Sequence, residues 1–127
     1  MRVLVIDDEK YVADTLVMIL RQTGYEAEAA YDGESALQRI ELFPPDCVIS
    51  DVIMTGMNGP DVCALIQSKH PNCHILLFSG QAASSEIVNE ARAKGHTWEL
   101  LAKPIDPDEL LEILTEVAAA GRLKQVS

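Results

Sequence analysis

The sequence RVLVIDD, residues 2–8, is an apolar run that ends in two aspartates. Its four consecutive aliphatic residues, Val3 to Ile6, are typical of a strand that is buried on both faces. The same arrangement, a short apolar run followed by polar residues, recurs as CVISD at 47–51, HILLFSG at 74–80 and ELLAKP at 99–104. A weaker, partly alternating run covers residues 25–30. The sequence therefore predicts five strands, at residues 2–6, 25–30, 47–50, 74–78 and 99–102.

Helical segments separate these strands. In residues 10–23 the apolar positions Val12, Leu16, Ile19 and Leu20 share one face, and Gly24 is a usual helix terminator. Proline suits the first turn of a helix, which favours helix starts near residues 60 and 107. We expect the remaining helices over residues 33–42, 60–69, 85–94 and from Asp106 onward, with residues 121–127 as a frayed end.

Strict alternation of strand and helix indicates an α/β fold with helices on both faces of a parallel sheet. Right-handed crossovers leave few topologies for such a chain. We expect a doubly wound, flavodoxin-like five-stranded parallel sheet of order 2-1-3-4-5. The chain has 127 residues and contains neither a linker-like stretch nor a segment of different composition. We therefore predict a single domain over residues 1–127.

The charge balance restricts the partners. Ten Lys and Arg oppose 20 Asp and Glu, which gives a formal net charge of −10. Such a surface repels phosphate backbones and anionic lipid, so we expect no nucleic-acid or membrane binding. The N-terminus becomes acidic too early for a signal peptide, and the three cysteines are widely spaced, which predicts a cytoplasmic protein without disulfides.

The residues that leave the predicted strands carry the chemistry. In an open parallel sheet, sites form beyond the carboxyl ends of the strands. There the chain places carboxylates, a hydroxyl and an ammonium group: Asp7-Asp8, Asp51, Ser79-Gly80 and Lys103-Pro104. Each group alone has a simpler interpretation as a helix cap, a turn residue or a solvated charge. Because all of these groups lie at the same edge of the sheet, we expect them to form one site.

The charges at this edge predict a divalent cation. Asp7, Asp8 and Asp51 supply three negative charges and Lys103 returns one, so two remain. Clustered carboxylates repel one another when nothing neutralises them. A purely oxygen ligand set favours Mg²⁺, with Mn²⁺ as the alternative.

Four motifs in chain order resemble the receiver domain of bacterial two-component response regulators, and the resemblance covers essentially the whole chain. The motifs are Ile6-Asp7-Asp8-Glu9, Asp51–Gly59, Phe78-Ser79-Gly80 and Lys103-Pro104. The resemblance implies that Asp51 accepts a phosphoryl group from a phosphohistidine. It further implies that Asp8, Asp51 and the backbone carbonyl of Ile53 hold Mg²⁺, with Asp7 acting mainly through a bound water.

The resemblance also assigns the phosphoryl contacts and the partners. Lys103 would pair with Asp51 and then with a phosphoryl oxygen, Ser79 would donate to another oxygen, and Gly80 would leave room for the group. The donor would be a sensor histidine kinase or a histidine phosphotransfer protein, and the signal would pass to a downstream protein target. We expect no output domain. We also expect a monomer or weak homodimer that catalyses only its own phosphorylation and slow dephosphorylation.

The chain departs from the family pattern at several positions, among them Ile105 in place of a frequent phenylalanine and a stretch from Gly95 to Lys103 that is one residue longer than usual. Thr55 stands where the family usually has proline. Leu100 replaces the aromatic residue that normally moves with the hydroxyl switch, and Trp98, two residues earlier, is the only tryptophan. We predict that Ser79 still moves and that Trp98 takes over as the aromatic reporter.

Two other classes remain as alternatives. A small haloacid-dehalogenase-type phosphatase also uses an aspartate, Mg²⁺, a hydroxyl and a lysine, but it needs Asp-x-Asp after the first strand, where this chain has Asp7-Asp8-Glu9. In that class Asp7 would carry the phosphoryl group. A nucleotide-binding or flavin-binding module would need a glycine- or hydroxyl-rich turn there.

Overall fold

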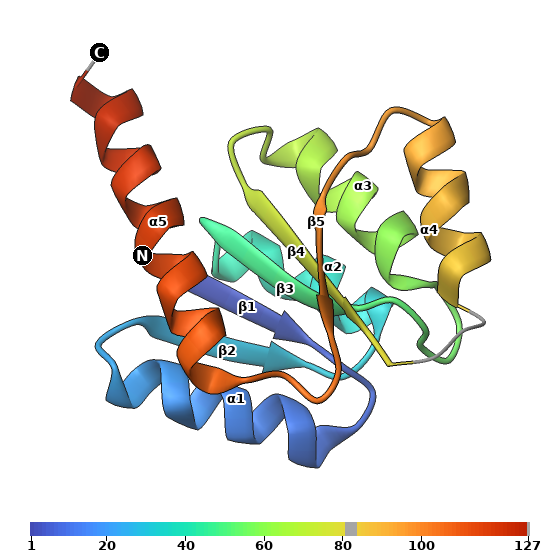
Figure 1. Ribbon diagram of the computed structural model, residues 1–127, viewed down its shortest axis with the longest axis horizontal. Helices are drawn as coiled ribbons and strands as arrows, with labels where there is room; N and C mark the ends of the chain where they lie inside the picture. Colours follow the sequence, from blue (N-terminus) through green and yellow to red (C-terminus); the bar gives the residue numbers. More distant parts are fainter. Residues whose placement is uncertain (81–83, 127) are drawn as a thin grey trace.

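The computed structural model describes residues 1–80 and 84–126 and contains an alternating series of strands and helices over them (Figure 1). The strands are β1 (Arg2–Ile6), β2 (Glu26–Ala30), β3 (Cys47–Asp51), β4 (His74–Ser79) and β5 (Glu99–Ala102). The helices are α1 (Lys10–Gln22), α2 (Gly33–Leu42), α3 (Gly59–Lys69), α4 (Ser84–Ala93) and α5 (Pro107–Val126).

The strands form one parallel sheet in the order β2-β1-β3-β4-β5. This is the predicted doubly wound order, and the fold prediction is confirmed. The order reverses between β1 and β3, because β2 lies on one side of β1 and the rest of the sheet on the other. The carboxyl ends of β1 and β3 are therefore neighbours at the switch point where such sheets bind ligands.

Each face of the sheet packs against its own helices. Alternate strand residues point to opposite faces, so Leu4 and Ile6 join a core with residues of α2, α3 and α4, while Val3 and Val5 join a second core with residues of α1 and α5. These strand residues are fully buried. The sheet is therefore packed between two hydrophobic cores, one on each face.

Local signals in the sequence set most helix ends. The Asp32 carboxylate accepts the Ser35 N–H at 2.7 Å at the start of α2, and the Asn58 side chain accepts the Asp61 N–H at 2.9 Å at the start of α3. Gly24 and Gly95 follow α1 and α4 with φ of +104° and +95°, which L side chains rarely adopt. The predicted boundaries therefore lie within about two residues of the observed ones at these helix ends.

Two sequence predictions about the helices are corrected. The fully buried stripe of α1 is Ala13, Leu16, Val17 and Leu20, whereas Val12 and Ile19 are only half-buried at its margins. The prediction of a frayed end at residues 121–127 is wrong for residues 121–126, because α5 continues through Gly121 to Val126. Three alanines precede that glycine, and their high helix propensity supports the extension. Ser127 lies outside the described residues.

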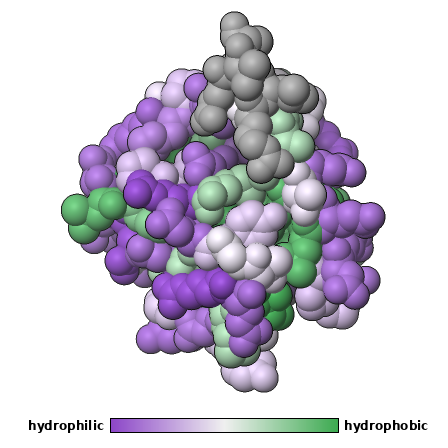
Figure 2. Space-filling model, turned by 90° about the vertical axis from the view of Figure 1, so that its left-hand side faces the viewer, coloured by the Kyte–Doolittle hydropathy of each residue, from purple (hydrophilic) through white to green (hydrophobic). Residues whose placement is uncertain are grey.

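Polar residues dominate the outer surface that Figure 2 shows, with a narrow band of hydrophobic and neutral residues between hydrophilic areas. This distribution fits the acidic composition. None of the helices in the described part of the chain is long and apolar enough to cross a membrane.

Candidate functional site

Four strands deliver the predicted site residues to one edge of the sheet. Asp7 and Asp8 follow β1 directly, Asp51 ends β3, Ser79 ends β4, and Lys103 follows β5. Parallel pairing keeps these ends level, because Asp51 pairs with Phe78 and Ser79 pairs with Ala102. The convergence predicted from the strand ends is therefore present.

Three carboxylates form the centre of the site. One oxygen from each of Asp7, Asp8 and Asp51 lies within 4.8 Å of the others. Asp7 is fully buried, Asp51 is 8% exposed, and Asp8 is exposed to solvent. The cluster is thus closed on the protein side and open at Asp8, which allows a small ion to enter while keeping some of its water.

Lys103 supplies the only ammonium group in contact with this cluster among the described residues. Its Nζ lies 3.1 Å from Asp51 Oδ2 and 3.4 Å from Asp7 Oδ2. The same Nζ lies 5.1 Å from the centre of the buried Phe78 ring, which adds a cation–π contact. The Lys103–Pro104 peptide bond is cis. Lys103 is therefore held against both buried aspartates.

Burial and charge shift two of the pKa values in the site. Burial raises the pKa of Asp7, and the repulsion from Asp51 adds to it; the Glu9 N–H and Lys103 oppose this without overcoming it. For Lys103, burial alone would lower the pKa, but the hydrogen bonds and charges of Asp51 and Asp7 outweigh burial and raise it. Lys103 is accordingly cationic at neutral pH, whereas the charge on Asp7 is not fully compensated.

Two glycines allow the close packing around Asp51. A Cβ on Gly59, the first residue of α3, would lie 1.9 Å from the backbone oxygen of Asp51. The N–H of Gly59 also donates to the Val52 carbonyl at 2.8 Å, so α3 begins directly against the end of β3. A Cβ on Gly80 would lie 3.0 Å from Lys103 Cβ. The side chain of Lys103 therefore leaves little room for a larger residue at position 80.

The remaining predicted residues lie at three different places. Ser79 is half-buried at the end of β4, and its carbonyl accepts the Lys103 N–H at 3.0 Å. Ile53 lies two residues beyond Asp51, half-buried against the core. Leu100 is 41% exposed on the edge strand β5.

Trp98 lies at the other end of the sheet. It precedes β5, whereas Ser79 pairs with the last residue of β5. Its Nε1–H donates to Gln67 Oε1 on α3 at 3.1 Å, and its ring stacks on His96 at 4.3 Å between centroids. Trp98 and Ser79 thus lie at opposite ends of β5, and the role of Trp98 as reporter stays a prediction that depends on transmission through β5 or α4.

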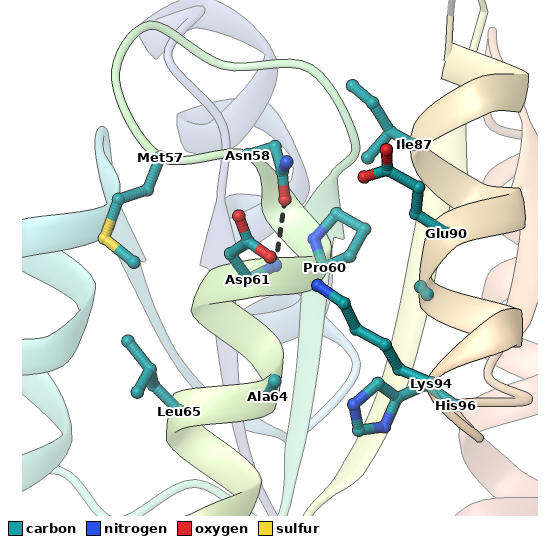
Figure 3. A pocket seen from close by; sticks show the side chains of 11 residues that line it. Met57, Asn58, Pro60, Asp61, Ala64, Leu65, Ile87, Glu90, Lys94 and His96 are labelled. Atoms are coloured by element: carbon teal, nitrogen blue, oxygen red, sulfur yellow. Dashed lines mark hydrogen bonds between the residues drawn. The ribbon is translucent and has the colours of Figure 1, made fainter.

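A pocket of about 350 Å³ lies between α3 and α4, away from the carboxylates (Figure 3). The close-up shows Met57 and Leu65 on the α2 side of α3, and Glu90 and Lys94 projecting from α4. His96, which stacks on Trp98, also lines it. None of the three clustered carboxylates lines this pocket, so it is separate from the site described above.

The donor set suits a hard divalent cation. All three clustered ligand groups are carboxylates, and their spacing within 4.8 Å allows one ion to contact more than one of them. A bound cation would offset the negative charge of the buried Asp7 carboxylate, whose pKa is raised mainly by burial. Asp7, Asp8 and Asp51 therefore fit Mg²⁺ or Mn²⁺ better than zinc.

Comparison with known proteins agrees with this geometry. The sequence matches the family model described as "Response regulator receiver domain" over residues 3–115. The chain belongs to the receiver domain family of response regulators. Proteins of this family typically bind Mg²⁺ through acidic residues and accept phosphate from kinases. This is the family that the four sequence motifs resemble.

Individual relatives show the extent of the similarity. The response regulator MprA of Mycobacterium avium is 35% identical over 111 residues, covering 87% of this chain and 48% of that protein. The chain thus spans about half the length of the curated relatives it matches. The chemotaxis protein CheY4 of Vibrio cholerae is 31% identical with a TM-score of 0.79, covering 91% of this receiver chain and 97% of that one. NtrX of Brucella abortus, solved in complex with ATP, is 28% identical with a TM-score of 0.83, covering 98% of this chain and 28% of that one.

Several contacts of this receiver domain were not predicted from the sequence. The Thr55 N–H and hydroxyl both reach Asp8, the Phe78 ring lies under Lys103, and the Tyr31 hydroxyl bonds Asp14 at 2.5 Å. All of them join residues distant in sequence. The position of Thr55 four residues after Asp51 was the one available signal, since it departs from the family pattern.

Proposed function

We propose that this receiver domain takes a phosphoryl group onto Asp51 from a sensor histidine kinase or a histidine phosphotransfer protein in the cytoplasm. The observation that carries the proposal is the pairing of Asp51 with Lys103 at 3.1 Å beside two further carboxylates within 4.8 Å. This combination gives a nucleophile, a fixed cation and an oxygen ligand set at one sheet edge. Phosphorylation would be read by a downstream protein target.

The transfer would proceed by attack of an Asp51 carboxylate oxygen on the phosphorus of phosphohistidine. The P–N bond breaks as the P–O bond forms, and the imidazole leaves and takes up a proton. Lys103 engages Asp51 Oδ2, so the other oxygen, Oδ1, is the one available for attack. Hydrolysis of the acyl phosphate by water then returns the carboxylate and inorganic phosphate.

Lys103 and Ser79 would stabilise the transferred group. The raised pKa of Lys103 keeps its ammonium charged, and a phosphoryl group on Asp51 would lie within its reach because Nζ already contacts that carboxylate. Ser79 ends the adjacent strand and would donate its hydroxyl to a second phosphoryl oxygen. Gly80 keeps the Lys103 stem unobstructed.

Asp7, Asp8, Asp51 and the carbonyl of Ile53 would hold the divalent cation. When bound, Mg²⁺ supplies positive charge that offsets the charge developing on the phosphoryl oxygens. Asp7 and Asp51 are buried and contact Lys103, which keeps their ligand oxygens in place. The chain would catalyse only its own phosphorylation and dephosphorylation.

The test is phosphorylation by acetyl phosphate with Mg²⁺, followed by intact-mass spectrometry. We expect one added phosphoryl group on the wild type, none on Asp51→Asn, and an unchanged yield on the control Asp61→Asn, whose exposed carboxylate lies on α3. Removal of the cation with EDTA should abolish the adduct. An undiminished adduct on Asp51→Asn would contradict the proposal.

A further inference from the structure

Two hydrogen bonds join the loop after β3 to the loop after β1. The Thr55 N–H donates to Asp8 Oδ2 at 3.2 Å, and the Thr55 hydroxyl donates to the same oxygen at 3.4 Å. Both residues are exposed, and 47 positions separate them in the sequence. Thr55 is therefore a direct tether on one member of the carboxylate cluster.

Asp8 is the member of the cluster that most needs such a tether. Asp7 is fixed by burial, by the Glu9 N–H at 2.9 Å and by Lys103, while Asp51 is fixed by β3 and by Lys103. Asp8 is exposed and lies beyond the end of β1. Among the described residues, only Thr55 donates hydrogen bonds to its side chain.

The two bonds also distinguish the oxygens of Asp8. Both reach Oδ2, and no described residue donates to Oδ1. A carboxylate held by one oxygen keeps the other for a cation and loses less side-chain freedom when the cation binds. Proline, which the family pattern usually has at this position, lacks the N–H and the hydroxyl and could make neither bond.

We propose that Thr55 is a positioning residue for Asp8, which it holds by Oδ2 so that the divalent cation meets an ordered ligand. This inference rests on the proposed function, because it takes the carboxylate cluster as the cation site. It predicts that part of the cation affinity of this chain comes from a side chain that does not touch the cation.

The experiment measures Mn²⁺ binding by the loss of the free-ion electron paramagnetic resonance signal, with Mg²⁺ competition. Thr55→Ser keeps both donors, Thr55→Val keeps the N–H alone, and Thr55→Pro removes both. We expect Thr55→Ser to bind like the wild type, Thr55→Val about twofold more weakly, and Thr55→Pro up to about tenfold more weakly, at the low end for residues that hold a metal ligand. Thr97→Val, at an exposed position at the far end of the sheet, is the matched control and should bind normally.

A second measurement separates positioning from a general effect on the fold. The Mg²⁺ concentration that half-saturates phosphorylation should rise in Thr55→Pro, while the rate at saturating Mg²⁺ falls less. In an Asp8→Ala background, Thr55→Pro should weaken Mn²⁺ binding no further, because the ligand it acts on is gone.

Two results would overturn the inference and leave the proposed function standing. One is wild-type Mn²⁺ affinity in Thr55→Pro, and the other is the same weakening by Thr55→Pro with and without Asp8. Failure of the wild type to bind Mn²⁺ or Mg²⁺ would overturn it together with the cation part of the proposed function. Normal cation binding without phosphorylation of Asp51 would overturn the proposed function and leave the positioning role standing.

Discussion

Removing the charge of Asp7 should stabilise the cation-free receiver domain, although Asp7 is a central residue of the site. Asp7 is fully buried and lies within 4.8 Å of two other carboxylates. At an effective dielectric constant of about 20, each of these repels it by about 3.5 kcal/mol at 4.8 Å. Lys103, at 3.4 Å, attracts it by about 5 kcal/mol on the same basis. About 2 kcal/mol of net repulsion remains, and the exposure of Asp8 to water reduces it.

We therefore expect Asp7→Asn to raise the free energy of unfolding by about 1–2 kcal/mol in EDTA. The amide oxygen can replace Oδ1, which accepts the Glu9 N–H at 2.9 Å. The amide nitrogen then replaces Oδ2, so the ion pair with Lys103 is lost, as the balance of charges above assumes. With Mg²⁺ at ten times its dissociation constant, the wild type gains about 1.4 kcal/mol, and the variant should gain less. The advantage of the variant should thus shrink or vanish when the ion is added.

The dependence on pH has a definite sign. The pKa of Asp7 is raised above 3.8 in the folded state, so the folded protein binds its proton more tightly than the unfolded chain does. The resulting stability is fully present below the unfolded pKa and is lost as the pH rises through the folded pKa. The advantage of Asp7→Asn over the wild type should accordingly be small below the unfolded pKa, grow as the pH rises through the folded pKa of Asp7, and then reach a plateau.

Urea unfolding followed by circular dichroism, with EDTA or Mg²⁺, measures both effects. Glu112→Gln, an exposed change on α5, is the control and should shift stability by less than about 0.5 kcal/mol. The reasoning is refuted when Asp7→Asn is less stable than the wild type in EDTA at neutral pH, since the carboxylate would then be stabilising without a cation.

Three further outcomes are expected. Gly59→Ala should destabilise the fold by about 2–4 kcal/mol in urea unfolding, because its Cβ would lie 1.9 Å from the backbone oxygen that ends β3; Gly121→Ala, with open space around its Cβ, should be neutral or stabilising. Thr15→Glu, on the helix α1 that begins just after Asp7 and Asp8, should slow phosphotransfer from the kinase but not from acetyl phosphate; equal slowing with both donors would place the damage in the fold or in the site itself. Beryllofluoride with Mg²⁺ should change the fluorescence of Trp98, and Ser79→Ala should reduce the change; constant emission while amide exchange in α4 responds would exclude Trp98 as reporter.

The order of elements and the members of the site could be predicted because both depend on local signals. Apolar runs mark the strands, and Gly24 and Gly95 mark where two helices stop. Once the sheet is known to be parallel, the residues after each strand must meet at one edge. The position of Asp51 beside Lys103 follows from this rule without any knowledge of side-chain contacts.

The remaining features depend on packing, which the sequence does not state. Helix α1 offers two overlapping apolar stripes, and in the packed core Ala13 and Val17 are buried while Val12 and Ile19 are only half-buried. The bonds from Thr55 to Asp8 arise because two loops meet across the switch point. Such contacts between distant positions could not be predicted from composition or periodicity.

Phosphorylation of Asp51 is the central claim, and mapping the modified residue tests it most directly. The protein is incubated with acetyl phosphate and Mg²⁺ and reduced with borohydride, which converts an aspartyl phosphate into homoserine. Peptide mass spectrometry then locates the reduced residue. We expect it at position 51 alone, and only when donor and cation are both present. Reduction at Asp7 or Asp8, or none at any aspartate, would contradict the account.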